Sequence, residues 1–356
     1  MGGRGVGLKA LVTGAGGFLG GAVARTLRAR GDAVRGFSRG EHPALAAAGV
    51  EQWRGDVSDR TAVMGAVQGV DVVFHVAAKV AAAGRLADFR ATNVVGTENV
   101  IAACRECGVQ AMVYTSTPSV VFGVADLEGV DEGVGYSDHY DSDYARTKAE
   151  AERHVLAAAC DDLRTVALRP HLVWGPGDTS LLPRVIERGR NGALRRITGP
   201  LKRTDVTFID DAVRAHLLAA DKLLAGGEDA RRINGRPYFL SSGEPVEIWG
   251  FIDGLLAAAG VPPITKSVSL RAALVAGWIF EKAHALLGAR GDPRMSRWIV
   301  RELTTSRWFD ITAARRDLGY ESAVSLDEGM HRLEAWLGGP IGDRIEDPSF
   351  EDQAGA

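Results

Sequence analysis

The sequence has few cysteines: Cys104, Cys107 and Cys160 are the only three in 356 residues. Three cysteines cannot form a disulfide framework, and the glycine-rich start, residues 1–7, lacks the apolar core of a signal peptide, so we expect a protein of the reducing cytoplasm. Cys104 and Cys107 form a C-x-x-C pair that no second pair or nearby histidine completes. We interpret them as small apolar residues on a helix and predict no metal site.

An excess of positive charge is also lacking, since the formal net charge is -3. Recognition of nucleic-acid phosphates needs a concentrated positive surface, so we expect no nucleic-acid partner. No apolar run is long enough to cross a bilayer. The most apolar run, 272–280 within the stretch 272–287, is flanked by Arg271, Glu281 and Lys282. We expect an amphipathic helix there, whose face covers the protein or contacts lipid, a partner enzyme or a long apolar substrate.

What the first half does contain is a regular alternation of short apolar runs and helical patterns. The expected strands are 8–13, 33–37, 50–54, 70–76, 111–115 and 165–168, and the expected helices are 18–30, 60–67, 89–107 and 144–159. Such alternation implies right-handed βαβ crossovers. It predicts an α/β fold with a doubly wound parallel sheet of the Rossmann type.

The alternation becomes less regular after about residue 170, where glycine–proline pairs mark loops. We expect helices at 208–224 and 246–259 and a strand at 238–241. Residues 8–170 are therefore predicted to form the Rossmann domain, and 171–340 mainly a smaller substrate lobe with some segments that return to that domain. The acidic end, 341–356, is predicted to be a weakly ordered tail.

A glycine-rich segment, G-A-G-G-F-L-G at 14–20, follows the first expected strand and opens the first expected helix. Glycines let the backbone approach a pyrophosphate, which then meets the N–H groups and the dipole of the helix N-terminus. Because the strand–turn–helix context is present, the segment predicts dinucleotide binding. We expect Gly14, Gly17, Phe18 and Leu19 to contact the cofactor.

The end of the second expected strand carries no acidic residue, which would bond the adenosine ribose and repel a 2′-phosphate. Ser38 and Arg39 instead offer a hydroxyl and a guanidinium suited to phosphate, although Arg39 also fits a solvated loop cation. We predict NADP(H), with NAD(H) as the alternative. Asp56, which precedes Val57, could accept from the adenine amino group or belong to the N-cap region of the next helix.

Tyr144 and Lys148 are spaced i, i+4 and share one face of an expected helix. A cationic lysine beside a phenol lowers the tyrosine pKa toward the range of a working general acid/base. The segment Y-T-S-T at 114–117 ends the preceding strand, where doubly wound folds place their chemistry. A hydroxyl there can hold a carbonyl oxygen while Tyr144 supplies the proton. Without these neighbours, the same spacing fits an exposed helical pair.

These elements together resemble the extended short-chain dehydrogenase/reductases over nearly the whole chain. The similar segments are 13–20, 71–78, 93–97 and the Tyr-x-x-x-Lys. Segments 168–178, 210–213, 308–311 and 317–320 resemble the 3β-hydroxysteroid dehydrogenase branch rather than nucleotide-sugar epimerases. Within that branch, segments 74–79, 91–104, 113–120 and 167–178 are similar to the bacterial 2-alkyl-3-oxoalkanoate reductases of olefin biosynthesis.

The resemblance implies roles for the catalytic residues. Tyr144 is then the general acid/base, and Lys148 orients the nicotinamide ribose and tunes Tyr144. Thr117 stands where the family has a catalytic Ser or Thr, with Ser116 or Ser119 as alternatives. Dehydratases of the superfamily carry an Asp-Glu pair after the active Thr, which is absent here, so sugar dehydration is disfavoured.

The resemblance also implies cofactor contacts. The residues expected along the path from adenosine to nicotinamide are Ala77, Ala78 and Lys79, with Pro170 and Val173 beside the nicotinamide. Tyr144 and Lys148 are expected to contact the cofactor as well, Asp56 and Val57 lie on its adenine side, and Asn93 supports the active-site architecture.

We therefore expect an NADPH-dependent reduction of a ketone to a secondary alcohol on an apolar small molecule, above all a long-chain 2-alkyl-3-oxoalkanoate. The alternatives are an NAD(P)-dependent 3β-hydroxysteroid dehydrogenase and a nucleotide-sugar epimerase. A protein that only senses the redox state of the cofactor is a fourth possibility, but such proteins usually lose the Tyr or the Lys. We also expect a homodimer.

Overall fold

The computed structural model describes residues 7–81, 84–286 and 295–338, so the expected tail at 341–356 and residue 287 lie outside the described residues. A seven-stranded sheet in the order β12-β7-β5-β4-β1-β2-β3 forms the centre of the molecule, and all its pairings are parallel. Its strands are β1 (Lys9–Thr13), β2 (Ala33–Ser38), β3 (Glu51–Arg54), β4 (Val72–His75), β5 (Ala111–Thr115), β7 (Arg164–Pro170) and β12 (Arg236–Leu240). The predicted doubly wound fold is confirmed.

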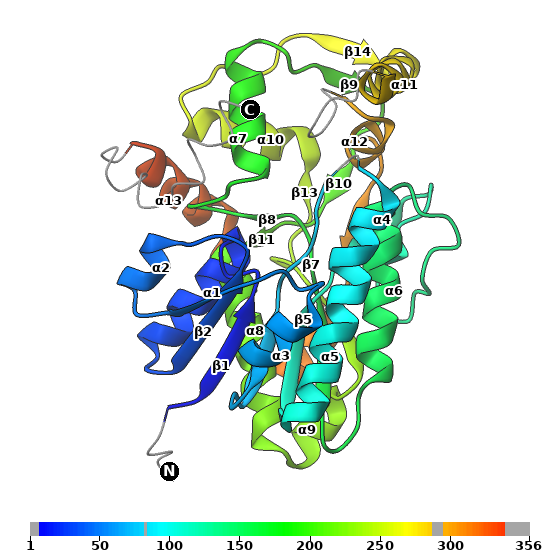
Figure 1. Ribbon diagram of the computed structural model, residues 1–356. Coiled ribbons are helices and arrows are strands. Elements are labelled where there is room, and N and C mark those ends of the chain that lie inside the picture. The colour runs from blue at the N-terminus through cyan, green and yellow to red at the C-terminus, as the bar shows by residue number, and fades with distance from the viewer. Residues whose placement is uncertain (1–6, 82–83, 287–294, 339–356) are drawn as a thin grey trace.

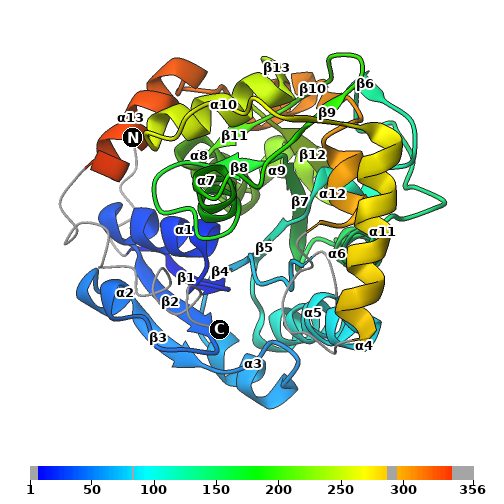
Figure 2. The same cartoon turned by 90° about the horizontal axis from the view of Figure 1, so that it is seen from above.

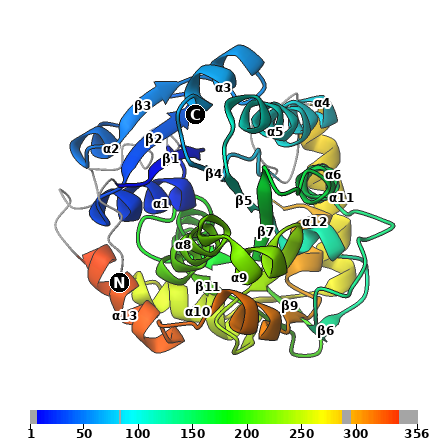
Figure 3. The same ribbon diagram turned by 90° about the horizontal axis from the view of Figure 1, so that it is seen from below.

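Helices cover both faces of this sheet (Figure 1 and Figure 3). One face carries α1 (Phe18–Ala29), α8 (Ile209–Ala225) and α9 (Gly227–Ile233), and the other carries α3 (Arg60–Val67), α5 (Gly96–Cys107) and α6 (Asp143–Ala157). Alternate residues of β1 enter different cores, since Ala10 and Val12 pack on the first side and Leu11 on the second. The strand order reverses at β1 and β4, and the crevice at their carboxyl ends is where such folds bind ligands.

The helix expected at 89–107 is divided into three parts. A short α4 (Leu86–Phe89) leads into a π-helical segment, η1 (Arg90–Val95), and only then into α5. Asn93 lies within η1 and is buried. A π turn holds one residue more than an α turn, and such turns occur frequently at functional sites.

Short elements gather beyond one end of the sheet and form the second part of the molecule (Figure 1 and Figure 2). Its strands are β6 (Leu127–Val130), β8 (Val173–Trp174), β9 (Arg196–Thr198), β10 (Arg203–Thr204), β11 (Thr207–Phe208), β13 (Val246–Glu247), β14 (Ser267–Ser269) and β15 (Arg307–Phe309). Its helical elements are η2 (Pro118–Val121), α7 (Leu181–Arg190), α10 (Ile248–Ala258), α11 (Leu270–Leu286), α12 (Arg297–Glu302) and α13 (Leu326–Gly338), while α2 (Pro43–Ala47) follows β2 and η3 (Ala314–Leu318) packs on α8, α9 and β12. Strand β12 and helix α8 belong to the central sheet layer although they follow residue 170. The helix expected from 246 begins at Ile248, because Val246 and Glu247 pair with β10.

Helix α11 occupies the outer edge of the molecule (Figure 2). Val275, Trp278 and Ile279 are about half exposed at 58%, 49% and 52%. Arg271 and Lys282 continue the same stripe at helical spacing. Among the described residues, no helix is both long and apolar enough to cross a membrane.

Candidate active site

Helix α6 presents Tyr144 and Lys148 at the carboxyl end of β5. The helix begins one residue before Tyr144, because Ser142 caps it by accepting a hydrogen bond from the Ala145 N–H at 3.2 Å. Lys148 lies one turn further along and is buried. The structure thus places both side chains of the Tyr-x-x-x-Lys motif where the spacing predicted them.

Thr117 lies two residues beyond β5, and its hydroxyl is near enough to Tyr144 to lower the pKa of that phenol. Its hydroxyl also lies 2.6 Å from the Ser119 hydroxyl and accepts from the Ser119 N–H at 3.2 Å. Ser116, the other alternative, instead donates to the buried carboxylate of Glu152. Of the three hydroxyls considered at the strand end, Thr117 is therefore the one that acts on the pKa of Tyr144, and its hydroxyl is hydrogen-bonded to that of Ser119.

Lys148 is directed at the backbone rather than at the tyrosine. Its Nζ donates to the Thr115 carbonyl at 2.6 Å and lies 4.0 Å from the centre of the Tyr114 ring. Burial lowers the pKa of Lys148 to about 7, against the opposing charge of Glu152. Burial raises the pKa of Tyr144 to about 12, although the nearby Thr117 hydroxyl acts to lower it. The expected lowering of the tyrosine pKa by Lys148 is not present in this arrangement.

A buried ion pair that the sequence did not predict lies next to these residues. Glu152, on α6 one turn after Lys148, accepts from Arg169 Nε at 3.0 Å and Nη2 at 2.5 Å. It also accepts from the Tyr136 hydroxyl at 2.7 Å and from Ser116. Glu152 and Arg169 are both almost completely buried. The spacing of Glu152 four residues after Lys148 was the available signal, but its partner on β7 is visible only in three dimensions.

The glycine-rich loop forms a tight cradle after β1. Gly14 has φ +69° and donates to the Phe37 carbonyl at 2.9 Å, and a methyl group on it would stand 2.7 Å from the Ala77 backbone. A methyl group on Gly20 would overlap the Gly14 carbonyl oxygen. Gly17 is the N-cap of α1 and offers no side chain to its free N–H groups. These features fit a dinucleotide pyrophosphate, since they leave room and backbone donors for an anion.

Phe18 and Leu19 open α1 and pack partly against the core. Phe18 also lies near Gly177, in the loop after β8, because a methyl group on that glycine would contact its ring at 3.8 Å. Phe18 thus connects the predicted cofactor loop with the predicted substrate lobe.

Ser38 is the last residue of β2 and Arg39 follows it, beside the loop after β3. Ser38 donates to the Gly40 carbonyl at 2.9 Å, and Arg39 is exposed. The charge of Arg39 helps lower the pKa of Asp56, although the bond from the Ser58 N–H is the larger cause. Asp56 forms this turn with Ser58 and is not the helix cap.

Asp59 and Asn99 hold the backbone on either side of Val57 and at its carbonyl group. Asp59, rather than Asp56, caps α3 by accepting from the N–H groups of Thr61 and Ala62. Val57 is buried, and its carbonyl accepts from Asn99 at 3.0 Å. The adenine-side loop is therefore fixed to α5.

Asn93 joins the loop after β4 to the catalytic helix. Its side chain accepts from the Lys79 N–H at 2.7 Å and donates to the Lys79 carbonyl and to the Thr147 hydroxyl. The Ala77 N–H donates to Thr13 at 3.3 Å, and Ala78 lies between these fixed points. The π turn of η1 thus directs a buried amide at the segment predicted to line the cofactor.

Pro170 and Val173 lie at the end of β7 and at the start of β8. Between them, His171 is buried with its ring 5.6 Å from Phe122, and burial lowers its pKa to about 3. Leu172 has φ +39° and is the one non-glycine residue with positive φ in the described chain. Strain of this kind is concentrated at binding sites, and here it lies beside the predicted nicotinamide position.

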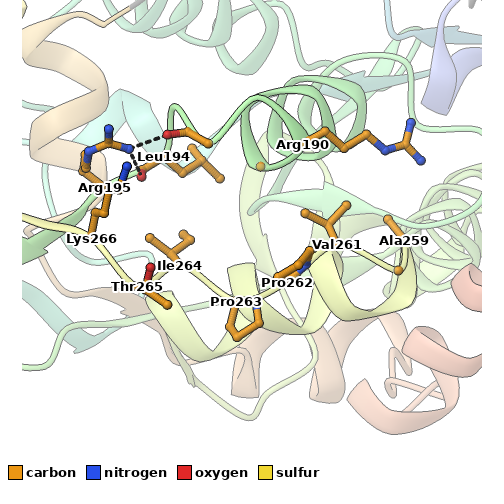
Figure 4. Close-up of a pocket in the computed structure, with 13 residues that line it drawn as sticks. Arg190, Leu194, Arg195, Ala259, Val261, Pro262, Pro263, Ile264, Thr265 and Lys266 are labelled. Atoms are coloured by element: carbon orange, nitrogen blue, oxygen red, sulfur yellow. Dashed lines mark hydrogen bonds between the residues drawn. The ribbon is translucent and has the colours of Figure 1, made fainter.

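The structure also contains a cavity of about 460 Å³ between the end of α7 and the segment from α10 to β14 (Figure 4). Arg190, Arg195 and Lys266 are among the residues that line it. Arg195 donates to the carbonyls of Gly192 and Leu194. The cavity lies in the second part of the molecule, away from Tyr144, and we assign no chemistry to it. Within the described residues, no group of three or more His, Cys, Asp or Glu could hold a metal ion.

Comparisons with known proteins agree with this geometry. The 3-beta hydroxysteroid dehydrogenase/isomerase family matches residues 11–271. The 2-alkyl-3-oxoalkanoate reductase of Stenotrophomonas maltophilia (strain K279a) is 46% identical over 330 residues, 92% of this chain and 99% of its own length. The enzyme of the same name from Shewanella oneidensis is 43% identical, over 92% of this chain and 86% of its own. Among solved structures, MoeE5 in complex with UDP-glucose and NAD is similar with a TM-score of 0.70 and 24% identity, over 92% of this chain and 98% of its own.

Proposed function

The chain belongs to the 3-beta hydroxysteroid dehydrogenase/isomerase family of NAD(P)-dependent oxidoreductases, and from this premise we propose that it reduces a ketone to a secondary alcohol with NADPH. The proposed substrate is a long-chain 2-alkyl-3-oxoalkanoate, and the product is the 2-alkyl-3-hydroxyalkanoate. The names of the two similar bacterial reductases support this substrate class. We propose olefin biosynthesis as the context, the cytoplasm as the location and a homodimer as the assembly.

The observation that carries the proposal is the hydroxyl pair of Thr117 and Tyr144 at the end of β5. With a pKa near 12, Tyr144 holds its proton at neutral pH, which is the form that a general acid needs for carbonyl reduction. Thr117 is placed to donate a hydrogen bond to the same carbonyl oxygen, and Ser119 lies behind it to orient its hydroxyl. When bound in this site, NADPH would supply the hydride that the carbonyl carbon needs.

The residues proposed to hold the cofactor belong to the loops and strand ends between the glycine-rich loop and the start of β8. They are Gly14, Gly17, Phe18, Leu19, Ser38, Arg39, Asp56, Val57, Ala77, Ala78, Lys79, Tyr144, Lys148, Pro170 and Val173. The preference for NADP(H) over NAD(H) is supported by Ser38 and Arg39, because no carboxylate stands at the end of β2.

A spectrophotometric screen tests the proposal directly. Purified protein would be given NADPH or NADH together with short 2-alkyl-3-keto acids, keto-steroids or UDP-sugars. We expect NADPH oxidation with the keto acids. Oxidation of hydroxysteroids with NAD, together with no turnover of NADPH and the keto acid, would overturn both the substrate and the cofactor. NAD that stays bound through purification would instead favour the epimerase alternative.

A further inference from the structure

A histidine that follows the second strand lies on the glycine-rich loop. His42 immediately precedes α2, and a methyl group built on Gly16 would overlap Nε2 and Cε1 of its ring and stand 2.7 Å from Cδ2. Gly16 does not have a positive φ. The absence of a side chain at this position therefore provides space for the His42 ring rather than freedom for the backbone.

The backbone of His42 is fixed by one side chain from β3. Gln52 accepts from the His42 N–H at 2.7 Å and donates to the His42 carbonyl at 3.0 Å. Within the described residues the two ring nitrogens make no hydrogen bond, and the side chain is half-buried. The protein thus holds an imidazole in place on the loop while its donor and acceptor atoms stay available to a ligand.

Two guanidinium groups, those of Arg39 and Arg54, belong to the segments next to His42. Arg39 is exposed at the end of β2, and Arg54 donates from Nε to the Arg39 carbonyl at 3.1 Å. Gly40 lies under the imidazole, with a methyl group on it 3.7 Å from His42 Nε2. Two carboxylates lie near by: Glu41, which precedes His42 and is exposed, and Asp56, one of whose oxygens is already occupied by the bonds from Ser58. The segments 38–42 and 54–58 therefore bring together two guanidinium groups, the His42 ring and two carboxylates, of which the exposed Glu41 is free to turn toward solvent.

We infer that His42, together with Arg39, binds the 2′-phosphate of NADP(H) and is a specificity-determining residue. The inference rests on the proposed function, since it concerns the same cofactor site. In folds of this class the adenosine ribose lies between the glycine-rich loop and the end of the second strand, and the ring of His42 spans those two segments. A phosphate oxygen there can accept from the imidazole while the Arg39 fork neutralises its charge.

Calorimetric titration with adenosine 2′,5′-bisphosphate and with 5′-ADP isolates the 2′-phosphate without any turnover. We expect the native protein to bind the bisphosphate more tightly. His42→Phe keeps a flat ring but removes the N–H, and it should weaken bisphosphate binding about tenfold. Binding of 5′-ADP should stay within about twofold, as expected when only the 2′-phosphate contact is lost. His139→Phe, at an exposed histidine, is the matched control and should change the affinity for neither ligand.

Gly16→Ala offers a second test, because the added methyl group must displace the His42 ring. Gly16→Ala should reduce the preference for the bisphosphate over 5′-ADP, as His42→Phe does. The double variant should show no greater loss of this preference than either single variant. If the preference persists in His42→Phe, the inference fails while NADP(H) binding stands. Equal native affinities for the two ligands would overturn the NADP(H) proposal itself. If His42→Phe binds both ligands more tightly than the native protein does, the ring hinders binding at the glycine-rich loop, and this result also overturns the inference.

Discussion

At the scale of single residues, removal of the Tyr144 hydroxyl should reduce the catalytic activity more than removal of any other group. Tyr144→Phe keeps the ring and removes the proton that we assign to the reaction. A general acid contributes roughly 10²–10⁴-fold, so kcat/KM for the keto acid should fall by about that factor. Binding of NADPH, followed by its fluorescence, should change much less. This difference would separate a chemical role from a loss of folding.

Tyr140→Phe is the matched control for that experiment. Tyr140 is partly buried, and its hydroxyl accepts a hydrogen bond from Arg153 at 3.4 Å on the surface near α6. It should retain nearly full activity. Unchanged turnover in Tyr144→Phe would favour a protein that senses the cofactor rather than an enzyme.

Glu152 provides a pH-dependent prediction. Its carboxylate raises the pKa of Lys148, which burial lowers to about 7. Glu152→Gln removes that charge, so the pKa of Lys148 should fall further below 7. If protonated Lys148 is the active form, the alkaline limb of kcat/KM should move to lower pH, by about one unit for one lost opposite charge.

Glu150→Gln on the same helix is the control, because Glu150 pairs with Arg90 on the partly exposed surface. It should leave the pH profile unchanged. Glu152→Gln also leaves Arg169 buried without its partner and should lower the melting temperature. A lower melting temperature with an unmoved alkaline limb would assign Glu152 a structural role alone.

The sequence predicted the relative positions of those site residues that are close to each other along the chain. Tyr144 and Lys148 are four residues apart on one helix, and helical geometry alone puts them on one face. His42 and Gly16 are different, because their contact depends on how the chain returns from β2 to the first loop. Arg169 likewise reaches Glu152 only after β7 has joined the sheet. Contacts of this kind carry no periodic signal.

At the scale of elements, strong apolar runs predicted the central sheet well, and the weak elements were missed. All six expected strands lie in the sheet, since long-range burial and local pattern agree there. The π turn of η1 was invisible, because its sequence has the apolar spacing of an ordinary helix. The sheet β13-β10-β15-β6 was missed because its strands are two to four residues long. Such strands are too short to show an alternating pattern.

Helix α11 gives the prediction that belongs to this scale. Its exposed stripe, Val275, Trp278 and Ile279, has Arg271 at one end and Lys282 within reach, a pattern typical of helices that lie on an anionic lipid surface. Trp278→Glu combined with Ile279→Glu should abolish co-sedimentation with phosphatidylglycerol vesicles. Turnover of short, soluble keto acids should be unchanged.

Leu201→Glu is the matched control, since Leu201 is 80% exposed but lies outside α11. It should leave vesicle binding intact. If the native protein stays in the supernatant with the vesicles, the lipid role of α11 is wrong. A partner enzyme or the substrate itself would then be the remaining candidate for its apolar face.

At the scale of the whole molecule, three buried histidines join separate parts of the fold. His75 on β4 bonds to hydroxyls of β1 and α5, and His216 on α8 bonds to a hydroxyl of β5. His171 packs between the rings of Phe122 and Phe309. Burial lowers the pKa to about 3 for His75 and His171 and to about 4 for His216. All three are therefore neutral in the folded protein at neutral pH.

The stability of the fold should consequently decline in mild acid. As pH falls from about 6.5 to 4.5, the unfolded chain protonates these histidines while the folded chain does not, so each one removes up to about 1.4 kcal/mol of stability per pH unit. Asp205, whose pKa burial raises to about 7, works in the opposite direction, as do Glu132 and Asp178, whose pKa values burial raises by less. The urea midpoint of unfolding should therefore fall over this range, and His216→Gln should make the fall shallower by about 1.4 kcal/mol per unit. His139→Gln, at an exposed position, should leave the slope unchanged, and an equal slope in both variants would contradict the assignment of this acid sensitivity to buried histidine.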